Sequence, residues 1–185
     1  MLQGLTTRWR DALADLDPRA RAAGAIALVV AINQPFYPLY LHAIAGAAAT
    51  SAWLTLLSTP FFAAVPAIAR RHSLLGRAML PLAGVANTML GVKLLGTPSA
   101  VELFLLPCIL LAAILFRPGE RAVMAFVLLA PVAAYVGVDR ILGPPLHAFS
   151  AEEYRSMIAL HAASACALTA FIGLQFSSAL SARGA

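Results

Sequence analysis

The chain has 185 residues, of which 61% are apolar and only 11% charged, and its 13 Lys and Arg outnumber its 8 Asp and Glu. A soluble globular domain usually carries about 25% charged residues. The sequence instead holds about six runs of roughly 20 mostly apolar residues, the length that crosses a bilayer. It therefore predicts an all-α, polytopic membrane protein in the lipid bilayer and excludes a soluble catalytic domain. The basic residues stand at the ends of these runs, which excludes a nucleic-acid-binding module.

The first segment, residues 1–17, is predicted to form an amphipathic helix in the membrane interface on the cytoplasmic side. Apolar residues recur at intervals of three and four, which places them on one helix face: Leu2, Leu5, Trp9, Leu13 and Leu16. Charged residues interrupt any apolar core, so the segment is not a cleavable signal peptide. Asp17 and Pro18 then provide an N-cap and a first-turn proline for the helix that enters the membrane.

Residues 18–185 are predicted to form one six-helix transmembrane domain without an internal repeat. The expected spans are residues 22–44, 47–69, 75–95, 100–116, 121–142 and 154–178. Turn signals such as Gly96-Thr97-Pro98-Ser99 separate neighbouring spans. Two helices should open with a capping box, in which a serine and a glutamate three residues later satisfy each other's backbone N–H groups. The pairs are Ser99 with Glu102 and Ser150 with Glu153.

The orientation follows from the basic residues, because Lys and Arg beside span ends are retained on the cytoplasmic side. One side collects ten of them: Arg8, Arg10, Arg19, Arg21, Arg70, Arg71, Arg77, Arg117, Arg121 and Arg183. The other side has Lys93, Arg140 and Arg155. Both termini should therefore be cytoplasmic. The richness in Ala, Leu and Arg is compatible with a bacterial inner membrane protein.

Polar residues inside or near the spans gather in the half away from the cytoplasm. Such residues are costly in lipid unless they face a partner or a cavity. We expect them to form a ligand-binding site at a helix broken by Pro35 and Pro38, and the candidates are Asn33, Tyr37, Tyr40, His42, Asn87, Lys93, Glu102 and His161. The alternative is structural: Lys93 snorkels to the interface, Glu102 caps a helix, and the amides and His161 only join neighbouring helices.

Metal and cofactor chemistry has weak support in the sequence. His42 and His161 are candidate haem ligands, but they should differ in depth by on the order of 10 Å, which does not suit two axial ligands of one iron. Cys108 and Cys166 are single and lie within spans, so neither a disulfide nor a metal site is expected. No cofactor is predicted.

Catalytic motifs such as GxSxG, HExxH or a phosphate-binding loop do not occur in the chain. A small transporter or channel, with Lys93, Glu102 and Asp139 along its path, is one alternative function, and a haem-binding membrane protein is another. Against the transporter, no two halves with matching interrupted helices are visible.

One stretch carries a family resemblance. Val101-Glu102-Leu103-Phe104-Leu105-Leu106-Pro107-Cys108, followed by Leu115-Phe116-Arg117 and Glu120-Arg121, resembles the fourth span and following loop of six-helix membrane domains. These domains precede the catalytic parts of bacterial class III adenylate cyclases and of some sensor histidine kinases. Further matches in the same order, over residues 75–180, are Asn87 with Gly91, Pro145-Leu146, Ser150, and Leu160-His161 with Ser164 to Phe176. One departure is His161, where the family commonly has asparagine.

The resemblance implies a membrane anchor and sensor that forms a homodimer. It would serve a cytoplasmic output domain that would lie beyond Ala185. Cyclase activity itself does not carry over to these residues. With the topology, this predicts a sensor domain of a signal-transduction protein that binds an unknown small or lipidic ligand in a polar cavity of the outer half.

Overall fold

The structure, a computed structural model, describes residues 16–181 and consists of helices joined by short turns. The predicted interfacial helix at residues 1–17 lies outside the described residues except for its last two positions. The α-helices are α2 Pro18–Asn33, α3 Phe36–Ala45, α4 Thr59–Arg71, α5 Ser73–Leu95, α6 Leu105–Leu115, α7 Arg121–Leu142 and α8 Ala151–Ser181. The 3₁₀ helices are η1 Gly46–Ser58, η2 Thr97–Ser99, η3 Val101–Phe104 and η4 Pro118–Glu120. The prediction of an all-α chain is confirmed.

Four helical stretches of the described chain are long and apolar enough to cross a membrane. They are Pro18–Arg71, Ser73–Leu95, Pro118–Val138 and Ala151–Ser177, and a shorter apolar stretch covers Val101–Leu115. Because a helix of about 20 mostly apolar residues spans the hydrocarbon core, these stretches indicate an integral membrane protein in contact with lipid.

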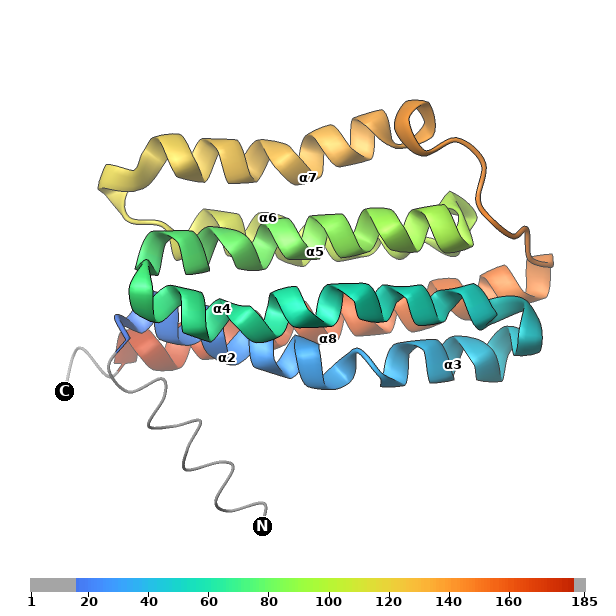
Figure 1. Cartoon of the computed structure of the whole chain (residues 1–185), viewed down its shortest axis with the longest axis horizontal. Coiled ribbons are helices and arrows are strands. Elements are labelled where there is room, and N and C mark those ends of the chain that lie inside the picture. Colours follow the sequence, from blue (N-terminus) through green and yellow to red (C-terminus); the bar gives the residue numbers. More distant parts are fainter. Residues whose placement is uncertain (1–15, 182–185) are drawn as a thin grey trace, which may run out of the picture.

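The longest of these stretches folds back on itself. α2 and α3 follow one another in one direction, and after α3 the chain reverses so that η1 and α4 return beside them (Figure 1). α2 ends at Asn33 and α3 begins at Phe36. Pro35, between them, lacks a backbone N–H and its ring crowds the preceding turn. The predicted break in the first apolar segment is therefore present.

α5 is the central helix of the bundle, with contacts to α2, α4, α6 and α7 (Figure 1). Its approach to α4 depends on Gly76, because a Cβ atom there would lie only 2.5 Å from the Cβ of Ala69. α8 packs against α2, α3 and α6 and so closes the other side of the bundle. The helices with the most lipid-facing surface are α7 and α8, on which residues such as Phe126, Leu129 and Leu174 are exposed.

The two predicted capping boxes have opposite outcomes. The box at Ser150 is confirmed: its hydroxyl accepts from the Glu153 N–H at 3.3 Å, and the Glu153 carboxylate accepts from the Ser150 N–H at 2.7 Å. The box at Ser99 and Glu102 is wrong. Ala100 is left-handed with φ +56°, the Ser99 hydroxyl donates to the Gly96 carbonyl at 2.7 Å, and the α-helix begins only at Leu105.

A buried ion pair closes the end of the bundle at which α2 and α5 begin. Arg77 of α5 is 1% exposed. Its guanidinium donates to both carboxylate oxygens of Glu120 in η4, at 2.6 and 2.7 Å, and to the carbonyl of Leu115, the last residue of α6, at 2.7 Å. The bidentate geometry is the strongest form of this pair. Arg77 thereby fixes the turn between α6 and α7 to α5.

Asp17 extends this polar cluster to α2. Its carboxylate accepts from the N–H groups of Arg19 at 3.1 Å and Ala20 at 3.3 Å, which confirms the predicted N-cap, and it also accepts a hydrogen bond from the Ser73 hydroxyl of α5. Burial of Asp17 alone would raise its pKa. The hydrogen bonds and the charges of Arg77 and Arg117 outweigh burial and hold the pKa below its ordinary value.

Candidate functional site

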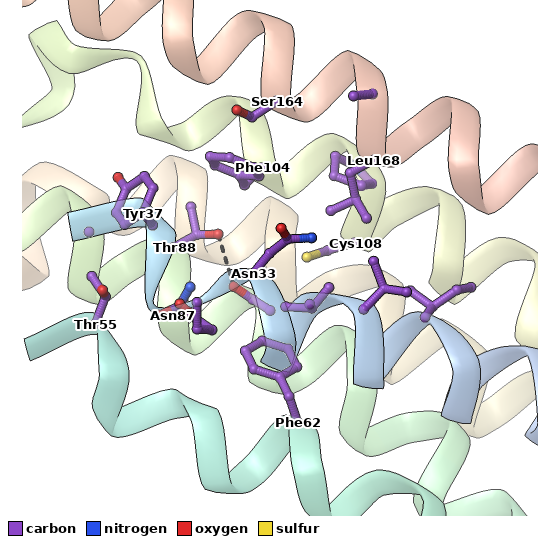
Figure 2. A pocket seen from close by; sticks show the side chains of 18 of the residues that line it. Asn33, Tyr37, Thr55, Phe62, Asn87, Thr88, Phe104, Cys108, Ser164 and Leu168 are labelled. Atoms are coloured by element: carbon purple, nitrogen blue, oxygen red, sulfur yellow. Dashed lines mark hydrogen bonds between the residues drawn. The ribbon is translucent and has the colours of Figure 1, made fainter. Parts of the chain in front are cut away.

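A cavity of about 380 Å³ lies within the bundle, between α2, α3, α5, α6 and α8, with η1, η3 and α4 contributing to its wall (Figure 2). Sites for small ligands usually enclose about 300–1,000 Å³. Most of the lining side chains are apolar, among them Ile26, Phe62, Leu80, Leu111 and Phe171. The cavity is therefore large enough for a small ligand and offers it mainly apolar contact.

The break between α2 and α3 brings amide and phenol groups to the cavity wall. Asn33 ends α2, and Tyr37 and Tyr40 lie on α3. The Asn33 amide has no hydrogen-bond partner among residues 16–181 and lies on the cavity side of the helix (Figure 2). Asn33 is thus a polar group for which a ligand would be the natural partner.

A second group of polar side chains joins three segments of the wall. Gln34, buried at the break, donates from its amide to the Ser58 hydroxyl at 2.6 Å. That hydroxyl lies 2.9 Å from the Asn87 side-chain oxygen on α5 and 2.8 Å from the Thr55 carbonyl. The exposed carbonyls and amides of an interrupted helix need such partners in lipid. The Gln34–Ser58–Asn87 chain therefore stabilises the break and fixes Asn87 at the cavity wall.

His161 of α8 links the cavity wall to the last helix. It is fully buried, its Nδ1 lies 2.6 Å from the Ser99 carbonyl, and its Nε2 lies 2.9 Å from the Tyr37 hydroxyl. A carbonyl accepts only, so Nδ1 carries the proton and donates to Ser99. Nε2 of the neutral ring then accepts from Tyr37. Any movement of Tyr37 in the cavity therefore acts directly on a side chain of α8.

The structure brings together some of the residues that the sequence predicted for the site. Asn33, Tyr37, Tyr40 and Asn87 line the cavity, and His161 stands behind Tyr37. His42, Lys93 and Glu102 are not among the lining residues. Lys93 donates to the carbonyls of Leu142 at 2.9 Å and Pro144 at 2.8 Å, so it ties the end of α7 to α5. The structure thus gives Lys93 structural contacts, and its place in the site stays a prediction.

Several polar lining residues were not among the site residues predicted from the sequence: Gln34, Thr55, Thr88, Cys108 and Ser164. Serine and threonine occur throughout apolar helices, where they bond to the preceding turn, as Thr88 does to the Gly84 carbonyl at 2.9 Å. Their type therefore gives no signal of a site. A usable signal was the helical spacing of Leu160, Ser164, Ala167, Leu168 and Phe171, which puts these lining residues on one face of α8.

Within residues 16–181, no cluster of three or more His, Cys, Asp and Glu side chains is arranged to hold a metal ion. Comparison of the chain with known protein families, with characterised proteins and with solved structures found no match. The function is accordingly argued from the cavity and its wall.

Proposed function

We propose that the chain is a membrane sensor domain of a signal-transduction protein, which binds a small or lipidic ligand in the cavity and transmits its presence through α8 to a cytoplasmic output domain. The observation that carries the proposal is the hydrogen bond between Tyr37, which lines the cavity, and His161 of α8. A ligand that shifts Tyr37 changes the contacts of α8, because both nitrogens of His161 are engaged. Small shifts or rotations of a helix are a common form of signal transfer.

The proposal includes six membrane-crossing segments with both termini in the cytoplasm of a bacterial cell. The segments would be α2 with α3, η1 with α4, α5, η3 with α6, α7, and α8. In its support, the first long stretch folds into a hairpin, and the apolar segment Val101–Leu115 precedes α7 with a turn between them. The polar cluster around Arg77 lies at the end that holds most basic residues, as expected of the cytoplasmic side.

This topology is tested with reporter fusions in bacterial cells. A fusion after Ala185 is expected to be active as a cytoplasmic reporter, and a fusion in the turn at residues 143–149 as an external one. Activity of the fusion after Ala185 only outside the cell would overturn the orientation. The same location for both fusions would overturn the number of spans.

The sensor function is tested on the purified full chain. Its bound molecules are extracted with organic solvent and identified by mass spectrometry, and the compound found is returned to the extracted protein. Cys166 is exposed on α8 while Cys108 is buried, so a bimane dye attaches to Cys166. We expect the returned compound to shift the dye's emission.

Matched variants show whether the compound occupies the cavity. Ser164→Phe places an aromatic ring in the cavity, and Ala133→Phe places the same ring on the exposed surface of α7. We expect the compound to be lost from Ser164→Phe and retained by Ala133→Phe. Equal recovery from both variants, or binding without any emission shift at Cys166, would contradict the sensor proposal.

A further inference from the structure

The chemistry of the cavity wall defines the class of ligand, given the ligand-binding function proposed above. We propose that the occupant is a neutral amphiphile, with an apolar chain and one uncharged hydrogen-bonding head group, which enters sideways from the bilayer. Three observations carry this inference: the charge of the lining, the distribution of its polar groups, and the position of its exposed residues.

Among the residues that the structure describes, none that lines the cavity has a charged side chain. The polar groups of the lining are amides, hydroxyls and a thiol, and among them the exposed Asn33 amide has no hydrogen-bond partner within residues 16–181. An ion moved from water into such surroundings loses hydration that only an opposite charge or a dense set of hydrogen bonds replaces. Phosphate, carboxylate and ammonium head groups are therefore disfavoured, and an uncharged alcohol, ketone or amide is favoured.

The amide and hydroxyl groups of the lining gather toward one end of the cavity, and the Cys108 thiol lies among the apolar residues of the other. Along α2 and α3, Ile26 and Val30 precede Asn33 and Tyr37, and along α5, Leu80 precedes Asn87 and Thr88. α8 runs in the opposite direction, and there Ser164 comes before Leu168 and Phe171. Figure 2 shows Tyr37, Asn87 and Thr88 toward one end of the cavity and Cys108 and Leu168 toward the other. A head group fits the first half and an apolar chain fits the second.

The exposed part of the lining lies on the side of the bundle where α2 and α3 meet α8. Asn33, Tyr40 and Ala167 are exposed lining residues, whereas the lining residues of α5 and α6 are mostly buried. Asn33 ends the 16-residue helix α2, about 24 Å along its axis at 1.5 Å per residue. That depth is within a hydrocarbon core about 30 Å thick. A molecule dissolved in the bilayer therefore reaches the cavity without crossing water.

The Asn33 amide at the opening and the Tyr37 hydroxyl farther in both suit a head group with a hydroxyl. The Tyr37 proton is donated to His161, so the Tyr37 oxygen is left to accept a hydrogen bond. The Asn33 amide both donates and accepts. A ligand hydroxyl can donate to the Tyr37 oxygen, and a ligand oxygen can accept from the Asn33 amide, so each of these lining groups offers a hydrogen bond to an uncharged head group.

The test uses the full chain in liposomes with three photoreactive probes that have the same chain and different heads: diazirine-bearing analogues of hexadecanol, hexadecyl sulfate and hexadecyltrimethylammonium. We expect the hexadecanol analogue to crosslink to peptides of α5, α6 or α8 that line the cavity, and excess hexadecanol to compete. A neutral hydrogen bond contributes about 1 kcal/mol, equivalent to about fivefold in affinity. Asn33→Leu should therefore lower the crosslinking about fivefold.

Ser164→Phe should abolish the crosslinking and Ala133→Phe should leave it unchanged. Crosslinking of the cavity by either charged probe as strongly as by the neutral one would overturn the inference about the head group and leave the ligand-binding function standing. Recovery of a water-soluble compound from the purified protein would overturn the bilayer route alone. Failure of all three probes to reach the cavity, with no compound recovered from the protein, would remove both this inference and the proposed function.

Discussion

Replacing Arg77 with methionine is expected to lower the free energy of unfolding by about 3 kcal/mol. Arg77 is 1% exposed, and three of its hydrogen bonds end on Glu120 and the Leu115 carbonyl. Its removal leaves the Leu115 carbonyl without this donor and leaves the Glu120 carboxylate without its opposite charge, with the Arg117 N–H at 2.7 Å as a remaining donor. Breaking a buried pair from one side costs about 3–5 kcal/mol, and the lower value applies because the Glu120 side chain is 20% exposed.

Paired variants distinguish the contribution of the ion pair to stability from the contribution of side-chain packing. Arg77→Lys keeps the charge but not the two-pronged geometry, so it should recover only part of the loss. Arg77→Met combined with Glu120→Met should be less destabilised than Arg77→Met alone, because no uncompensated carboxylate remains. Arg121→Met, at an exposed arginine of α7, serves as the control and should change stability by less than about 0.5 kcal/mol.

The measurement is unfolding of the full chain in detergent micelles, followed by circular dichroism as a denaturing detergent is added. Equal stability of Arg77→Met and Arg121→Met would show that the contacts around Arg77 do not hold the turn between α6 and α7. If the double variant lost as much stability as the sum of the losses in Arg77→Met and Glu120→Met, the two residues would act independently.

Arg77 also illustrates which features of the protein could be predicted from the sequence and which could not. Hydropathy identified the apolar helices, and the two prolines identified the break in the first of them, since both signals are local. Arg77 was assigned to the cytoplasmic side from the general distribution of basic residues. Its burial depends on Glu120, which is 43 positions away, and no local pattern relates the two residues.

The distinction between local patterns and long-range contacts also explains which of the candidate site residues line the cavity. Asn33 and Tyr37 were found because they accompany Pro35, and Asn87 because an amide within a span is unusual. Lys93 was included for its charge, but its partners are carbonyls of the turn that follows α7. At Ser99, the sequence matched a capping box, yet the left-handed Ala100 delays the helix to Leu105 and directs the serine hydroxyl to Gly96. The Ser99 carbonyl also accepts from His161 of α8, 62 positions away, and no local pattern predicts that contact.

Replacing His161 with leucine is expected to lower the free energy of unfolding by about 2–4 kcal/mol. Leucine fills much of the same volume, but the Ser99 carbonyl and the Tyr37 hydroxyl lose their partner, and an unsatisfied buried polar group costs about 1–3 kcal/mol. Tyr37→Phe removes one neutral hydrogen bond and should cost about 1 kcal/mol. In the His161→Leu background, Tyr37→Phe should cost almost nothing, because the bond it removes is already absent.

Stability alone does not distinguish a packing histidine from one that transmits a signal, so the bimane emission at Cys166 is the second readout. If His161 couples the cavity to α8, both Tyr37→Phe and His161→Leu should lose the emission shift at saturating compound. His161→Leu should retain the affinity for the compound, whereas Tyr37→Phe also removes an acceptor for the ligand and should weaken binding about fivefold. Asn87→Leu, also at the cavity wall but without a contact to α8 through His161, should retain the shift at saturating compound. An unchanged shift in His161→Leu would assign this residue to packing, because the ligand would then act on α8 without the only hydrogen bond between Tyr37 and that helix among the described residues.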